Sequence, residues 1–109
     1  MTNLLLKREE RRRQDREELR QEVRRRLRQA LQELIPGEKA ILFGSVTRPY
    51  GFHLRSDVDI AFVEEPKTIS RYRLQVRLEE LILHPVDLVL LSECRFRDKI
   101  QREGEVWTS

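Results

Sequence analysis

The residues of this chain whose types and spacing suit chemistry are acids that follow a glycine-serine turn. Gly44 and Ser45 end the apolar run at residues 41–43, and after a polar loop Asp57 and Asp59 open a second apolar run. In a β-strand, residues two apart point to the same face, about 7 Å from one another, so the two carboxylates lie side by side. Paired carboxylates suit Mg²⁺, which binds a few acids together with waters and substrate phosphates.

The same stretch offers a place for phosphate, and a later stretch offers a third acid. Gly44 has no side chain, so a triphosphate can approach the backbone, and the Ser45 hydroxyl and any helix starting there supply donors and a positive dipole end. Asp87 is the one acid in the apolar run at residues 85–91. Because burying an acid is costly without a cation or donor partner, we expect Asp87 to be the third metal ligand.

At these residues the chain resembles the minimal nucleotidyltransferases of the polymerase-beta superfamily, whose signature is Gly-Ser, a loop, Asp-x-Asp and a third Asp on a following strand. The resemblance covers about residues 31–105 and includes the ending at residues 100–104. It implies that Asp57, Asp59 and Asp87 are catalytic and hold Mg²⁺, with two ions expected. It also implies that ATP is the substrate.

The resemblance further implies that Gly44 and Ser45 hold the triphosphate, and that Arg48 belongs to the nucleotide-binding loop. That loop departs from the family pattern in two ways. Thr47 stands where the family often has Ala, and Pro49 follows Arg48 where Gly is usual. The interval from Ser45 to Asp57 is also one residue longer than usual.

Family members of this size are typically encoded beside a HEPN-domain ribonuclease toxin and act as its antitoxin, transferring AMP from ATP to a toxin tyrosine. The resemblance therefore implies a protein adenylyltransferase that forms a hetero-oligomer with a HEPN toxin. Two alternatives stay open. The chain could be a non-catalytic antitoxin that acts by contact, or a basic nucleic-acid-binding module, although the interspersed acids favour a solvated helix over nucleic-acid binding.

Composition points to one small, highly charged domain. The chain has 109 residues, of which 39% are hydrophobic and 38% charged, and it contains neither an apolar stretch of membrane-spanning length nor a secretory signal. Its one cysteine, Cys94, cannot form an internal disulfide, so we expect a cytoplasmic protein. Two histidines far apart in the sequence offer no zinc site.

The basic charge belongs to the N-terminal segment. Residues 1–28 hold 11 Lys and Arg against 6 acids, whereas residues 29–109 hold 11 against 13. Residues 7–18 contain no apolar residue, so we expect a solvated helical extension over residues 1–18 and a nucleotidyltransferase domain over residues 19–109. From Leu19 apolar residues recur at helical spacing, and Pro36 and Gly37 end the predicted helix.

The expected fold is α/β (α+β), a mixed sheet of three or more strands flanked by helices. Residues 71–78 alternate polar and apolar as a strand does, but a leucine stripe and the family resemblance favour a helix there, capped by Thr68 or Ser70. A last helix is expected after Ser92 as its cap, with Phe96 and Ile100 facing inward and Gly104 as its end. The strands are apolar on both faces, so we expect a sheet covered on both sides, partly by a partner protein.

Overall fold

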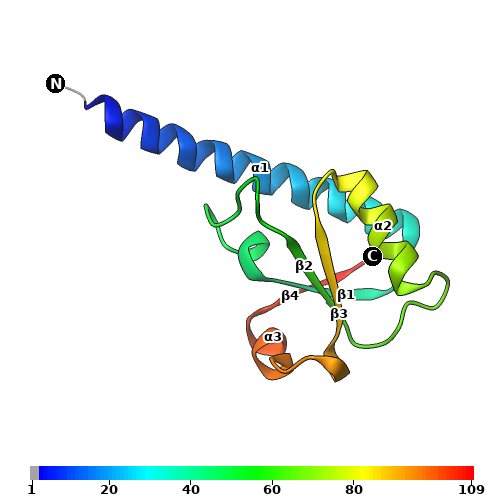
Figure 1. The fold of residues 1–109 in the computed structure, drawn as a ribbon. Helices are drawn as coiled ribbons and strands as arrows, with labels where there is room; N and C mark the ends of the chain where they lie inside the picture. Colours follow the sequence, from blue (N-terminus) through cyan, green and yellow to red (C-terminus); the bar gives the residue numbers. More distant parts are fainter. Residues whose placement is uncertain (1–2) are drawn as a thin grey trace.

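A helix of 31 residues, α1 (Leu4–Leu34), opens the part of the chain that the computed structural model describes, residues 3–109 (Figure 1). The elements that follow are β1 (Lys39–Phe43), a 3₁₀ turn (Gly44–Thr47), β2 (Val58–Phe62), α2 (Arg71–Ile82), β3 (Val86–Leu90), a second 3₁₀ turn (Leu91–Glu93), α3 (Arg97–Glu103) and β4 (Glu105–Thr108). The expected mixed α/β class with a long N-terminal helix is confirmed.

The four strands form one mixed sheet in the order β3-β2-β1-β4. β1 pairs antiparallel with both β2 and β4, whereas β2 and β3 are parallel and are joined by the crossover helix α2. Because parallel neighbours start at the same edge of a sheet, the first residues of β2 and β3 lie side by side. This pairing brings Asp59 opposite Asp87.

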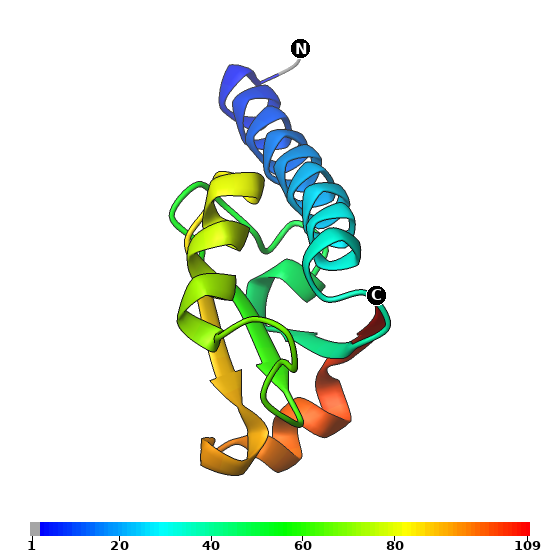
Figure 2. The same ribbon diagram turned by 90° about the vertical axis from the view of Figure 1, so that its right-hand side faces the viewer.

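α1 has two halves with different environments. The side chains from its start to Arg16 are exposed, as expected of a stretch without an apolar face, and this half projects beyond the sheet in Figures 1 and 2. The second half packs on the domain through its apolar stripe, whose buried members are Val23, Leu27, Ala30 and Leu31. The predicted division after residue 18 falls within this continuous helix, so it stays a prediction.

Sequence signals at the ends of the two longer helices are confirmed. α1 is capped at Ile35 and is followed by Gly37, whose φ is +80°. The Ser70 hydroxyl caps α2 by accepting a hydrogen bond from the Arg73 amide at 3.2 Å. Residues 71–78 are therefore helical, because the leucine stripe that includes Leu74 and Leu78 packs into the core and this packing outweighs the local alternation.

The two faces of the sheet are covered unequally. One face packs against α1 and α2 and holds the larger core, which includes Leu42, Ile60 and Leu88. On the other face Ile41 and Ala61 pack with Ile100 of α3 (Figure 1). The end of this second face that carries Asp59 and Asp87 has no helix over it among the described residues, so the expected cover on both sides is only partly present within the chain.

The start of the last helix was predicted wrongly. Ser92 lies in the second 3₁₀ turn and caps nothing, and α3 begins only after Phe96, which is 66% exposed and does not face inward. The reason is that the chain makes this extra turn at the end of β3, closed by the Cys94 amide bonding to the Leu91 carbonyl, which delays the helix. Ile100 is buried and Gly104 ends α3, as predicted.

No helix among residues 3–109 combines the length and the apolar character that a bilayer crossing requires.

Candidate active site

Three acids meet on the open face of the sheet. Asp59 pairs in register with Asp87 on the neighbouring parallel strand, about 4.8 Å away between backbones, and Asp57 precedes Asp59 by two residues on the same face. Phe43 of β1 is the register partner of Asp59 on its other side. The structure therefore brings together all three acids singled out in the sequence.

Asp87 is exposed, contrary to the expectation that its apolar neighbours would bury it. Its neighbours Val86 and Leu88 point into the core on the helix-covered face, and alternation along β3 turns Asp87 to the open face. No desolvation penalty is then needed to explain this acid. Its carboxylate is free to meet a ligand that approaches from solvent.

Asp59 is the least exposed of the three acids and feels the other two. Burial, together with the negative charges of Asp87 and Asp57, raises the pKa of Asp59 to about 6 from an ordinary value of 3.8. The positive charge of Arg48 opposes this shift, which places Arg48 near the acids. The cluster therefore holds more negative charge than its surroundings balance, as expected of a site that takes a cation.

Gly44 fits against Asp59 and could not be another residue without rearrangement. Its φ of +73° lies in the left-handed region, and a Cβ added there would clash with Oδ2 of Asp59. The strand β1 thus ends in a turn whose first residue lies against the central acid. This contact joins the predicted phosphate-binding turn and the predicted metal-binding acids into one site.

The chain makes a short hydrogen-bonded turn after β1. Within residues 44–47 the chain forms one turn of 3₁₀ helix, in which the first N–H groups have no partner of their own. The Thr47 hydroxyl donates to the Gly44 carbonyl at 2.7 Å, and the Arg48 amide donates to the Ser45 carbonyl at 3.1 Å. Ser45 is half-buried within this turn.

A hollow of about 380 Å³ lies between this turn and α3. It is lined by Gly44 and Arg48 on one side and by Phe96 and Lys99 on the other. An exposed aromatic ring and two cations beside a glycine turn are groups that suit a nucleotide's base and phosphates. The sequence did not single out Phe96 and Lys99 as lining residues, because Phe96 was expected to face inward and it instead lies exposed just before α3.

The acids fit Mg²⁺ as an open ligand set. Among residues 3–109 no three acidic, histidine or cysteine side chains converge tightly enough to enclose a metal by themselves. Mg²⁺ characteristically binds through one or two carboxylates and takes waters and phosphates for its remaining positions. Hard oxygen donors, excess negative charge and an open face all suit that mode of binding.

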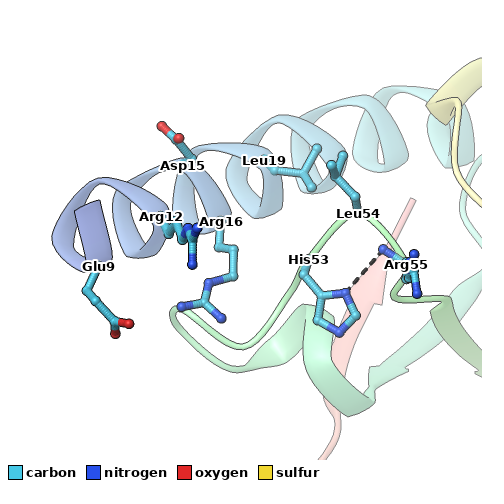
Figure 3. A pocket seen from close by; sticks show the side chains of 8 residues that line it. All are labelled: Glu9, Arg12, Asp15, Arg16, Leu19, His53, Leu54 and Arg55. Atoms are coloured by element: carbon cyan, nitrogen blue, oxygen red, sulfur yellow. Dashed lines mark hydrogen bonds between the residues drawn. The ribbon is translucent and has the colours of Figure 1, made fainter. Parts of the chain in front are cut away.

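A second, larger hollow of about 700 Å³ lies between the exposed half of α1 and the loop that precedes Asp57. Arg12 and Arg16 lie on the side of α1 that faces this loop, whereas Asp15 points away (Figure 3). Arg55, on the loop, lines the same hollow. The two acids that line it, Glu9 and Asp15, are six residues apart on α1 and lie among three arginines. We therefore assign the chemistry to the sheet face that carries Asp57, Asp59 and Asp87.

Comparisons with known proteins identify the family to which the chain belongs. Residues 21–109 match the family described as Polymerase beta, Nucleotidyltransferase. A crystal structure of a toxin-antitoxin with AMP-PNP is 28% identical with a TM-score of 0.52, and the match covers 74% of this chain and 69% of that chain. A crystal structure of the toxin-antitoxin MntA-HepT is 25% identical with a TM-score of 0.48, covering 74% and 66%. No curated protein matches the chain significantly.

Proposed function

Because the chain belongs to the polymerase beta nucleotidyltransferase family, we propose that it is an antitoxin that transfers AMP from ATP to a tyrosine of a partner HEPN-domain toxin. The observation that carries this proposal is the register of Asp59 with Asp87, beside Asp57 and against Gly44. A nucleotidyl transfer needs divalent metal next to a triphosphate, and these residues supply places for both.

The nature of the nucleotide and of the partner is supported by one similar structure. The toxin-antitoxin crystal structure that matches 74% of this chain contains AMP-PNP, an analogue of ATP. The open end of the sheet face leaves room for an acceptor that another protein brings. An acceptor from a second protein also fits a chain in which the end of the face that carries the acids has no helix over it among the described residues.

Each residue has a distinct task in the proposed reaction. Asp57 and Asp59 would hold Mg²⁺, and Asp87 would complete the ligand set. When bound, the metal lowers the pKa of the attacking hydroxyl and neutralises the charge of the pyrophosphate. The turn amides at Gly44 and Ser45 hold the β- and γ-phosphates, while Arg48 and Lys99 flank them from the two sides of the hollow.

The proposed reaction is a nucleophilic displacement at the α-phosphorus of ATP. The tyrosine oxygen forms a bond to the α-phosphorus, the bond from that phosphorus to the bridging oxygen breaks, and pyrophosphate leaves. Asp87 accepts the phenolic proton, since it is exposed on the face from which the acceptor approaches.

A labelling experiment tests the proposal directly. The purified chain is mixed with the HEPN-domain protein encoded beside it, MgCl₂ and ATP labelled at the α-phosphate. The HEPN-domain protein should become labelled and gain the mass of AMP. Peptide sequencing should map the added AMP to a tyrosine. Asp57→Ala should abolish the label, and Asp15→Asn, a change to an exposed acid on α1, should leave it intact.

The same experiment separates catalysis from contact. If Asp57→Ala still binds and neutralises the HEPN protein as well as the wild-type chain does, and if the wild type transfers no label, the chain acts as a binding antitoxin and the enzymatic proposal is wrong.

A further inference from the structure

α1 reaches the nucleotide-binding loop through buried charged contacts. Arg20 is only 5% exposed, and its Nε donates to the Val46 carbonyl at 2.8 Å. Arg24 donates to the same carbonyl through Nη1 at 3.2 Å. Val46 belongs to the 3₁₀ turn that starts at Gly44, so two guanidinium groups bind one carbonyl of the turn.

A second contact holds the end of the same loop. Glu17 receives the Nη1 donor of Arg20 at 2.6 Å, and its other oxygen accepts the Tyr50 amide at 2.8 Å. Tyr50 has a φ of +63°, a left-handed conformation that a tyrosine adopts only where its surroundings impose it. The guanidinium of Arg13 also lies over the Tyr50 ring, 4.4 Å from its centre.

These contacts fix which way the turn faces. The carbonyls of a helical turn point toward its C-terminal end and its first amides point the opposite way. Because α1 holds the Val46 carbonyl, the first amides of the turn are directed away from α1. Positive charge at the C-terminal end of the turn is also electrostatically favourable. Arg24 is anchored by two further bonds, at 3.1 and 2.7 Å, to the two carboxylate oxygens of Glu105.

We infer that Arg20 is a positioning residue for nucleotide binding, which holds the Gly44–Thr47 turn and, through Glu17, the Tyr50 backbone in the conformation that receives phosphate. The ligand in this inference rests on the proposed function, whereas the role of Arg20 rests on its contacts with Val46 and Glu17. α1 is then part of the active-site architecture, since its buried charges hold the turn while its apolar stripe shares the core with Val46 and Phe52.

The test compares Arg20→Met with Arg20→Lys and with Arg26→Met. Arg26 is on the same helix, is paired with Glu22 and makes no contact with the loop, so its variant is a matched control. All are measured below their unfolding midpoints by titration calorimetry with AMP-PNP and MgCl₂. Arg20→Met should weaken nucleotide binding about 10- to 100-fold, since small misplacements of binding groups have effects of this size. Arg20→Lys should restore part of the affinity, and Arg26→Met should bind as the wild type does.

Amide hydrogen exchange supplies a second readout that needs no nucleotide. In Arg20→Met the amides of Arg48 and Tyr50 should exchange faster, while those of β2 keep their protection. Folded Arg20→Met that binds AMP-PNP as tightly as the wild type overturns the positioning role alone. A wild-type chain that binds no AMP-PNP overturns the proposed function instead. In that case the positioning role is still tested by hydrogen exchange, and it is overturned if the Tyr50 amide of Arg20→Met exchanges at the wild-type rate.

Discussion

Replacing Asp59 by asparagine should stabilise the metal-free protein while abolishing its activity. The acid is partly buried beside two other acids, and its pKa is raised to about 6 from 3.8. Because the folded pKa lies above the unfolded value, the contribution of Asp59 to stability is fully present below about pH 4 and is lost as the pH rises through about 6. At pH 8 the ionised carboxylate therefore opposes folding.

The size of the effect follows from the shift. A difference of about two pKa units corresponds to about 3 kcal/mol, which we reduce to about 1–3 kcal/mol because solvent reaches part of the side chain. For a domain of this length that equals a rise in Tm of about 4–12 °C for Asp59→Asn at pH 8. At pH 4 the Tm of the variant and of the wild type should nearly coincide.

The measurement is thermal unfolding in low-salt buffer with EDTA at pH 4, 6 and 8, with Asp15→Asn as the control variant. MgCl₂ at pH 8 should raise the Tm of the wild type and leave that of Asp59→Asn unchanged. An Asp59→Asn variant that is less stable than the wild type at pH 8, or whose Tm difference does not vary with pH, refutes the argument from accumulated charge.

Three further results are expected. Gly44→Ala should lose about 1–3 kcal/mol of stability in chemical denaturation and should lose AMP-PNP binding, because its Cβ meets Asp59 in a left-handed backbone conformation; a variant as stable as the wild type would contradict this. Mg²⁺ affinity measured by calorimetry should fall as the pH drops below about 6, where Asp59 takes up a proton, and an affinity that is independent of pH between 5 and 8 would exclude Asp59 as a ligand. Deleting residues 1–11 should change the Tm little, because the described side chains of this segment are exposed. The alternative function has its own test. If the chain is a nucleic-acid-binding module, neutralising Arg11, Arg12 and Arg13 should remove a steeply salt-dependent affinity for RNA.

The positions of the acids and of the turn at Gly44 could be predicted from the sequence because each depends on local spacing. Asp57 and Asp59 share a face through the two-residue period of a strand, and Gly44 marks a turn where no side chain fits. Asp87 could be expected to join the other two acids, but its register with Asp59 could not be derived from local spacing, since strand register depends on contacts between distant segments.

What the sequence did not reveal depends on packing between elements. The extra turn at residues 91–93 exposes Phe96, and nothing in the local pattern indicates that turn. β4 was missed because its burial comes from Trp107, which lies beneath the guanidinium groups of Arg24 and Arg28 of α1, at 5.2 and 4.1 Å. Composition alone does not distinguish Arg20 from the other arginines of α1, although it stands three residues before Val23 on the apolar stripe.

The contact between Gly44 and Asp59 should constrain which substitutions evolution can accept at these two positions. A larger residue at position 44 is tolerated only if the carboxylate at position 59 withdraws, and a longer acid at position 59 needs the space that the glycine leaves. Among relatives that keep the chemistry, the two positions should therefore vary jointly or not at all, and a chain that has lost the acid should be the first to lose the glycine.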